Sequence, residues 1–90
     1  MKKLAVMIEV SGRVQGVGFR YQTQNKAVEL GVTGFAQNRP NGNVYIEAEA
    51  ESEALMEFVH WCRKGPPWAH VTDIRISDTL PMGYISFEIR

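Results

Sequence analysis

The stretch Leu4-Ala5-Val6-Met7-Ile8-Glu9-Val10-Ser11 runs directly into Gly12-Arg13-Val14-Gln15-Gly16-Val17-Gly18-Phe19-Arg20, and it decides the fold. In the first half, apolar residues return at every second position, a period that predicts a strand with one buried face. The second half has three glycines and no regular period, which indicates a loop. A helix over residues 21–30 is predicted to follow, ended by Gly31. The chain therefore begins with a strand, a glycine-rich loop and a helix.

The remainder repeats this alternation of strands and helices. Strands are predicted over 32–37 and 44–50, joined by a turn at 38–42 in which Asn41-Gly42 suits positive φ. A helix over 52–64 follows. Ser52 can cap it, basic residues close its last turn, and its apolar stripe is Leu55, Phe58, Val59 and Cys62. Two further strands are predicted over 71–77 and 84–90.

The order βαββαββ requires a sheet covered by both helices on one face. We therefore predict an α+β, ferredoxin-like two-layer sandwich: a βαββαβ core with an extra C-terminal strand and a mainly antiparallel sheet. The 90 residues are expected to form a single domain, 1–90. This fold is widely reused and by itself says little about function.

Composition excludes several classes of protein. Ten basic and ten acidic residues cancel, which argues against nonspecific binding of nucleic acid or of anionic membranes. No segment is long enough to cross a membrane. Cys62 is the only cysteine, so no intramolecular disulfide and no cysteine-based metal site is expected. This fits a reducing, cytoplasmic setting.

The glycine-rich loop carries the chemistry. It joins a strand to a helix start, where unpaired backbone amides and the helix dipole favour an anion. Gly16 and Gly18 lack Cβ atoms, so several N–H groups can approach one centre, and Arg20 adds a planar fork of donors. The loop lacks the Gly-Lys-Ser/Thr of a P-loop, and Tyr21 stands where a dinucleotide fingerprint needs a small residue. On these residues alone, an ordinary glycine-rich turn with Arg20 in a surface ion pair is equally compatible.

Two motifs together are more specific. The run Val10 to Arg20 resembles the first signature of the acylphosphatase family, and Gly34-Phe35-Ala36-Gln37-Asn38 with Gly42 and Val44 resembles the second. The resemblance covers nearly the whole chain. One departure is Ala50, where the second signature usually has glycine, and it bears on a local turn.

The resemblance implies hydrolysis of acyl phosphates to a carboxylate and inorganic phosphate, without metal or other cofactor. It implies that Arg20 and the loop amides bind the phosphoryl group and that Asn38 positions the attacking water. The implied substrate-binding residues are Gln15, Gly16, Val17, Gly18, Phe19 and Arg20. A carboxylate leaving group, whose conjugate acid has a pKa of about 4–5, needs little help from a general acid. Phosphate, the product, is expected to inhibit competitively.

Other polar residues are interpreted as structural. Asn38 alone would be a common turn residue; its place in the second motif favours the catalytic role. His60 and His70 show no partner for acid–base work. Glu47 and Glu49 are predicted on the solvent face of their strand, and Trp61 and Trp68 in core or rim packing. Arg13 is left open: it could touch phosphate, be solvated, or pair with the C-terminal carboxylate.

Three other functions compete with the hydrolase. A non-enzymatic anion-binding regulatory module could use the same loop but would not need Asn38. An RNA-binding module would need aromatic residues within a basic strand motif, which the central strands lack. The third alternative is a relative of the acylphosphatase-like domain that occurs in large hydrogenase-maturation enzymes. We favour a free enzyme, expected to be a monomer.

Overall fold

Each predicted strand and helix is present in the computed structural model, which describes residues 2–90. The elements are β1 (Leu4–Arg13), α1 (Phe19–Leu30), β2 (Thr33–Asn38), β3 (Val44–Ala50), α2 (Ser52–Lys64), β4 (His70–Thr79) and β5 (Phe87–Ile89). Met1, the first residue of the predicted domain, lies outside the described residues. The sheet order is β4-β1-β3-β2-β5. Only β2 and β5 pair in parallel; the other neighbours are antiparallel. The ferredoxin-like prediction is confirmed.

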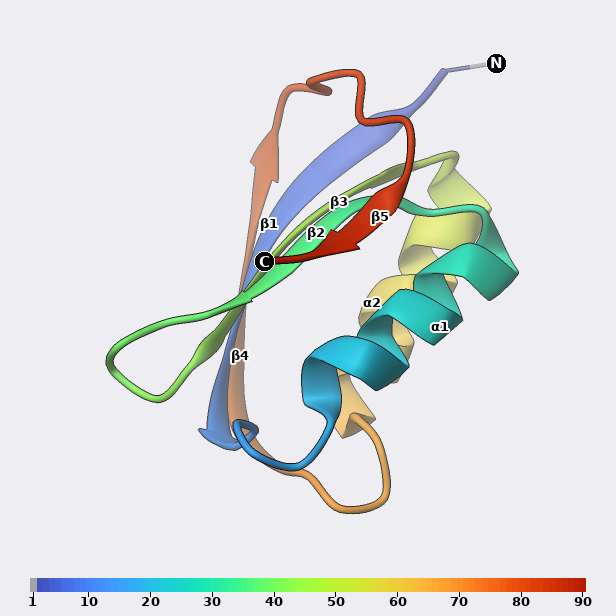
Figure 1. Ribbon diagram of the computed structural model, residues 1–90. Helices are drawn as coiled ribbons and strands as arrows, with labels where there is room; N and C mark the ends of the chain where they lie inside the picture. The colour runs from blue at the N-terminus through green and yellow to red at the C-terminus, as the bar shows by residue number, and fades with distance from the viewer. Residues whose placement is uncertain (1) are drawn as a thin grey trace.

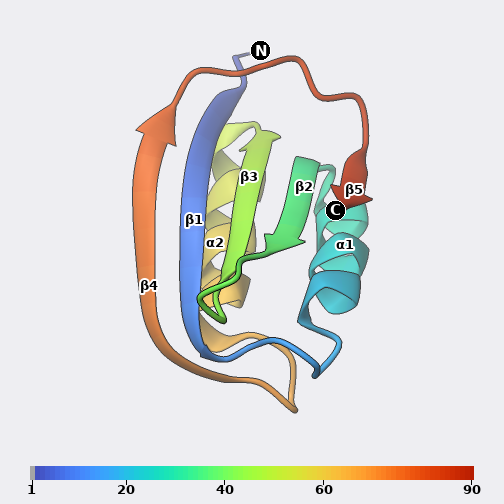
Figure 2. The same ribbon diagram turned by 60° about the vertical axis from the view of Figure 1, so that its left-hand side comes forward.

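Both helices cover one face of the sheet, as Figures 1 and 2 show. The alternation in β1 and β3 places Ile8, Val10 and Ile46 in the core with no exposed surface. From α2, Phe58 and Cys62 meet them, also fully buried, and burial of this kind contributes about 1.5–3 kcal/mol for a large apolar side chain. Burial also raises the pKa of the Cys62 thiol. The predicted apolar stripe of α2 is thus confirmed, with Val59 at its half-buried edge.

The boundaries of five elements differ from prediction. The strand β1 extends to Arg13, into the predicted loop, β2 is shifted by one residue, and β4 is longer at both ends. The helix α1 begins at Phe19, two residues early, because Gly18 with φ 76° ends the loop and serves as N-cap. The last strand covers only 87–89 rather than 84–90. The backbone N–H of Tyr84 donates to the Glu49 carboxylate instead of extending the strand.

Two local details were predicted wrongly. Ser52 is the first residue of α2 and not its cap, since Glu51 occupies that place without a side-chain hydrogen bond. In the β2–β3 turn only Gly42 has positive φ. Asn41 contributes through its side chain, which accepts a hydrogen bond from the backbone N–H of Asn43 at 3.0 Å. Ala50, the departure from the second motif, is accommodated as a buried residue of β3.

The prediction that Glu49 faces solvent is wrong: its side chain lies on the sheet face away from the helices, yet the residue is only 2% exposed. The connection from β4 to β5 covers it, and the backbone N–H groups of Met82, Gly83 and Tyr84 donate to its carboxylate. The packing predicted for Trp68 is also wrong, since that residue is 79% exposed. No helix within residues 2–90 combines the length and apolar character needed to cross a membrane.

Candidate active site

A cavity of about 220 Å³ lies where α1 begins and β2 and β5 end. In Figure 2 the start of α1 lies below the ends of β2 and β5, which stop at about half the height of the sheet. The lining residues are Val14, Gly16, Gly18, Phe19, Arg20, Tyr21, Asn38 and Ile89. The structure therefore brings Arg20 and Asn38, the two predicted catalytic residues, to one cavity from separate segments of the chain.

The loop side of this cavity is built for an anion. Gly16 and Gly18 have φ of 75° and 76°, a left-handed conformation that residues with a Cβ adopt at a cost. The first hydrogen bond within α1 runs from the Gln22 N–H to the Gly18 carbonyl at 3.0 Å. The amides of residues 19–21 therefore precede the first helical bond, and the positive end of the helix dipole adds to them. Such an arrangement binds phosphate or carboxylate.

Arg20 supplies the positive charge. Its Nη1 donates to the backbone oxygen of Arg90 at 2.7 Å, which fixes one arm of the guanidinium and leaves further N–H donors for a ligand. It is the only charged residue among those that line the cavity. Arg13 is exposed at the end of β1, outside the lining, and makes no ion pair within residues 2–90. The contact at Arg90, which we considered for Arg13, belongs to Arg20.

Asn38 is the last residue of β2 and pairs through its backbone with Val44 of β3. None of the side-chain hydrogen bonds found within residues 2–90 uses its amide, so the alternative of a turn residue bonded to its own backbone is not observed. Because β5 runs parallel to β2, the neighbouring Ile89 ends beside it at the cavity. An amide side chain there can both donate to and accept from a water molecule.

The other predicted binding residues divide into two groups. Gly16, Gly18 and Phe19 line the cavity, and the Phe19 ring is buried in the core behind it. Gln15 and Val17 do not line it. Val17 packs against the core cluster, and the Gln15 amide donates to the backbone oxygens of the β2–β3 turn.

Three lining residues were not predicted: Val14, Tyr21 and Ile89. Val14 and Tyr21 flank the predicted binding residues, 15–20, and could have been found by widening that range. Ile89 could be placed only from the parallel pairing of β5 with β2, for which the sequence carries no local signal.

The cavity lacks the residue types that most often act as general acid or base. Its lining includes no carboxylate, histidine or cysteine. Within residues 2–90 no group of three His, Cys, Asp or Glu side chains could hold a metal ion. A larger cavity of about 730 Å³, between α2 and the start of β1, is mostly apolar and contains none of the predicted site residues. The side chains of the smaller cavity can thus bind an anion, through Arg20, and orient a water molecule, through Asn38.

Similarity to known proteins extends over nearly the whole chain. The family model described as Acylphosphatase matches residues 6–89. The chain is 46% identical to an acylphosphatase of Thermotoga maritima over 96% of both chains. An acylphosphatase structure from Bacillus subtilis superposes with a TM-score of 0.93 at 41% identity, covering 97% of this chain and 98% of that one. Full-length HypF, in a phosphate- and nucleotide-bound form, superposes with a TM-score of 0.88 at 26% identity, but only 12% of its chain is covered.

Proposed function

The chain belongs to the acylphosphatase family and is an enzyme that hydrolyses acyl phosphates to a carboxylate and inorganic phosphate, and from that premise we propose how its residues act. Arg20 and the backbone amides of residues 15–20 bind the phosphoryl group, and Asn38 positions the attacking water. The observation that carries this proposal is the shared cavity of Arg20, Gly16, Gly18 and Asn38. No finding favours a non-catalytic anion-binding module.

The loop and Arg20 act on charge. Negative charge on the phosphoryl oxygens is matched by amides at the start of α1 and by the guanidinium of Arg20. The bond from Arg20 to the Arg90 oxygen holds the guanidinium in place before substrate arrives, so little reorganisation is needed during the reaction. Phosphoryl transfer depends mainly on such positioning and electrostatic stabilisation.

Asn38 acts on the nucleophile. The water oxygen forms a new bond to phosphorus while the bond from phosphorus to the acyl oxygen breaks, and the carboxylate leaves with that electron pair. A water proton passes to a phosphoryl oxygen of the substrate, since the cavity offers no side-chain base. The carboxylate needs no proton to depart, because its conjugate acid has a pKa of about 4–5. One amide side chain is then sufficient to orient the water.

Replacement of the two residues tests these roles separately. Arg20→Ala should lower kcat/KM for a synthetic acyl phosphate at least ~10²-fold, as expected for loss of a charge-stabilising donor. Asn38→Ala should lower kcat while the inhibition constant of inorganic phosphate stays nearly unchanged. Arg13→Ala is the matched control, an exposed arginine from the same segment that should behave as wild type. Near-normal activity of Arg20→Ala, or loss of phosphate affinity in Asn38→Ala, would contradict the assigned roles.

We also propose the setting in which this chemistry operates. The residues form one catalytic domain that works as a monomer in the cytoplasm, without metal or other cofactor, and phosphate inhibits it competitively. The composition of the lining supports metal independence, and the single buried cysteine and zero net charge are compatible with the rest. Full activity after dialysis against a chelator, and one monomeric species in sedimentation, are the expected results.

A further inference from the structure

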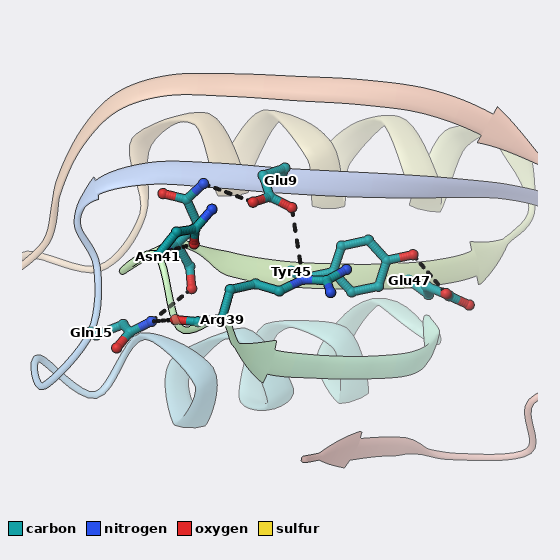
Figure 3. Close-up of polar contacts among 7 residues, drawn as sticks. Glu9, Gln15, Arg39, Asn41, Tyr45 and Glu47 are labelled. Carbon is teal, nitrogen blue, oxygen red and sulfur yellow. Dashed lines mark hydrogen bonds and ion pairs between the residues drawn. The ribbon is translucent and has the colours of Figure 1, made fainter.

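The Gln15 side chain points toward the β2–β3 turn (Figure 3), and Gln15 is not among the residues that line the cavity. Its Nε2 donates to the backbone oxygen of Arg39 at 2.7 Å and to that of Asn43 at 2.8 Å. These acceptors lie 24 and 28 residues further along the chain. A single amide thus joins the glycine-rich loop of residues 12–20, which we call the phosphate loop after its proposed role, to the turn between β2 and β3.

The two acceptors sit at the base of the turn that follows Asn38. Arg39 is the next residue, and its backbone N–H donates to the Asn43 oxygen at 2.8 Å. The Asn43 oxygen therefore receives both the Arg39 N–H and the Gln15 amide. Because Arg39 shares a peptide bond with Asn38, the Gln15 contact fixes the backbone where Asn38 leaves β2.

The same turn is held from its other side by β1. The Asn43 Nδ2 donates to Glu9 at 2.7 Å, and the Arg39 Nε lies 3.9 Å from the other Glu9 oxygen. The Arg39 guanidinium also lies over the Tyr45 ring, 4.1 Å from its centroid. Figure 3 shows Glu9 and Gln15 reaching the turn from different directions. The turn is therefore held between β1 and the phosphate loop.

We propose that Gln15 is a positioning residue, which sets the phosphate loop and Asn38 at a fixed separation through the base of the β2–β3 turn. The inference rests on the proposed function, in which the loop holds phosphorus and Asn38 holds the water. The two groups come from segments with no regular backbone pairing between them, so their separation depends on such cross-links. A misplacement of about 1 Å can cost about 10²-fold in rate.

The test is Gln15→Met, which keeps the side-chain length and removes the donor. We expect kcat to fall about 10-fold or more, since alignment is lost, while the inhibition constant of inorganic phosphate changes less than about 3-fold. Gln24→Met is the matched control, because the Gln24 amide likewise donates to a backbone oxygen, that of Phe87 at 2.9 Å, away from the cavity lining. It should leave kcat within about 2-fold of wild type.

A double-mutant cycle decides whether Gln15 acts through Asn38. If it does, Gln15→Met should change kcat by less than about 2-fold in an Asn38→Ala background. An equal fall in both backgrounds, or a single variant with wild-type kcat, would overturn the inference. Near-normal kcat of Asn38→Ala alone would instead overturn the proposed water-positioning role. Should Gln15→Met not fold, Gln15→Ala, which also removes both bonds to the turn, takes its place in the same cycle with the same expected non-additivity.

Discussion

Two loops that lie at opposite ends of the sheet (Figure 2) each contain a group of neighbouring backbone N–H donors, but they differ in what stands before those donors. In the connection from β4 to β5, the N–H groups of Met82, Gly83 and Tyr84 meet the carboxylate of Glu49. In the phosphate loop, the amides at the start of α1 face a cavity whose lining has a positive charge and no carboxylate.

We infer from this difference that the β4–β5 connection contributes to stability and that the phosphate loop contributes to function. Glu49 is almost fully buried and its oxygens accept hydrogen bonds from the chain itself. These bonds satisfy the buried carboxylate and hold the β4–β5 connection on the sheet, so they contribute to stability. At the other loop the cavity lining has Arg20 and no carboxylate, and under the proposed function the negative charge comes from the substrate. The same backbone chemistry therefore holds Glu49 in the β4–β5 connection, which we call the clamp (Glu49 with residues 82–84), and under the proposed function binds the substrate in the other loop.

The largest expected effect is a loss of stability when the carboxylate of the clamp is removed. Glu49→Ala should lower the free energy of unfolding by about 3 kcal/mol, because three amides lose a charged acceptor but can partly rehydrate. Urea denaturation measures this loss, and kcat of the folded variant should stay within about 2-fold of wild type, since the site lies at the other end. Glu57→Ala, at an exposed position of α2, is the control. A loss below 1 kcal/mol for Glu49→Ala would show that the connection is held by other contacts.

The second effect is stabilisation by ligand at the open loop. Phosphate at ten times its dissociation constant should raise the free energy of unfolding by about 1.4 kcal/mol, by mass action on the folded state. Chloride at equal ionic strength should not reproduce this increment. Arg20→Ala should lose the increment and Glu49→Ala should keep it. An equal increment in wild type and Arg20→Ala would mean that phosphate binds elsewhere.

A matched pair of glycines sharpens the comparison further. Gly18 in the phosphate loop and Gly83 in the clamp have φ of 76° and 83°, and an added Cβ would meet no other atom within 4 Å at either. Gly18→Ala and Gly83→Ala should each cost about 1 kcal/mol of stability from backbone strain alone. Only Gly18→Ala should lower kcat/KM, by about 10-fold, because its strain displaces amides that face the substrate. An equal fall in kcat/KM in both variants would contradict the inference that only the phosphate loop acts on the substrate.

The predictable part of this molecule is the part encoded in local periodicity. Alternating residues such as Val44 and Ile46 predict a strand and its buried face, and the stripe through Phe58 and Cys62 predicts a helix and its orientation. The meeting of Arg20 and Asn38 at one cavity followed from the two motifs and the fold they imply. These features can be predicted from residues that are close in the sequence or from the order of the strands in the sheet.

The parts that sequence did not reveal depend on single long-range contacts. Gln15 was grouped with substrate binding because it lies in the loop, but its side chain bonds to oxygens 24 and 28 residues away. Glu49 was assigned to solvent because it alternates with buried residues, but an amide 35 residues away covers it. Alternation identifies the sheet face away from the helices; it does not say whether a loop crosses that face.

Glu47, on the same face, allows the smallest and most specific test. It accepts hydrogen bonds from the hydroxyls of Tyr45 and Tyr84, both at 2.7 Å. Its bond and negative charge, together with burial, raise the pKa of Tyr84 to about 12. Burial first, and then the bond to Glu47, raises the pKa of Tyr45 to about 12. The folded state therefore holds these tyrosines in the neutral form to higher pH than the unfolded state does, since a tyrosine in the unfolded chain has a pKa of about 10.

The stability that this preference provides is fully present below pH 10 and is lost as pH rises from about 10 to 12, because the unfolded chain then releases protons that the folded chain retains. Tyr84→Phe should lower the free energy of unfolding at pH 8 by about 0.5–1 kcal/mol, for one hydrogen bond lost. The difference from wild type should shrink as pH rises above about 10 and change sign before pH 12, as measured by urea denaturation across that range. Because Tyr84 serves the clamp and not the cavity, phosphate should stabilise both proteins equally at pH 8. A difference between wild type and variant that stays constant with pH would mean that the Glu47 bond does not control tyrosine ionisation.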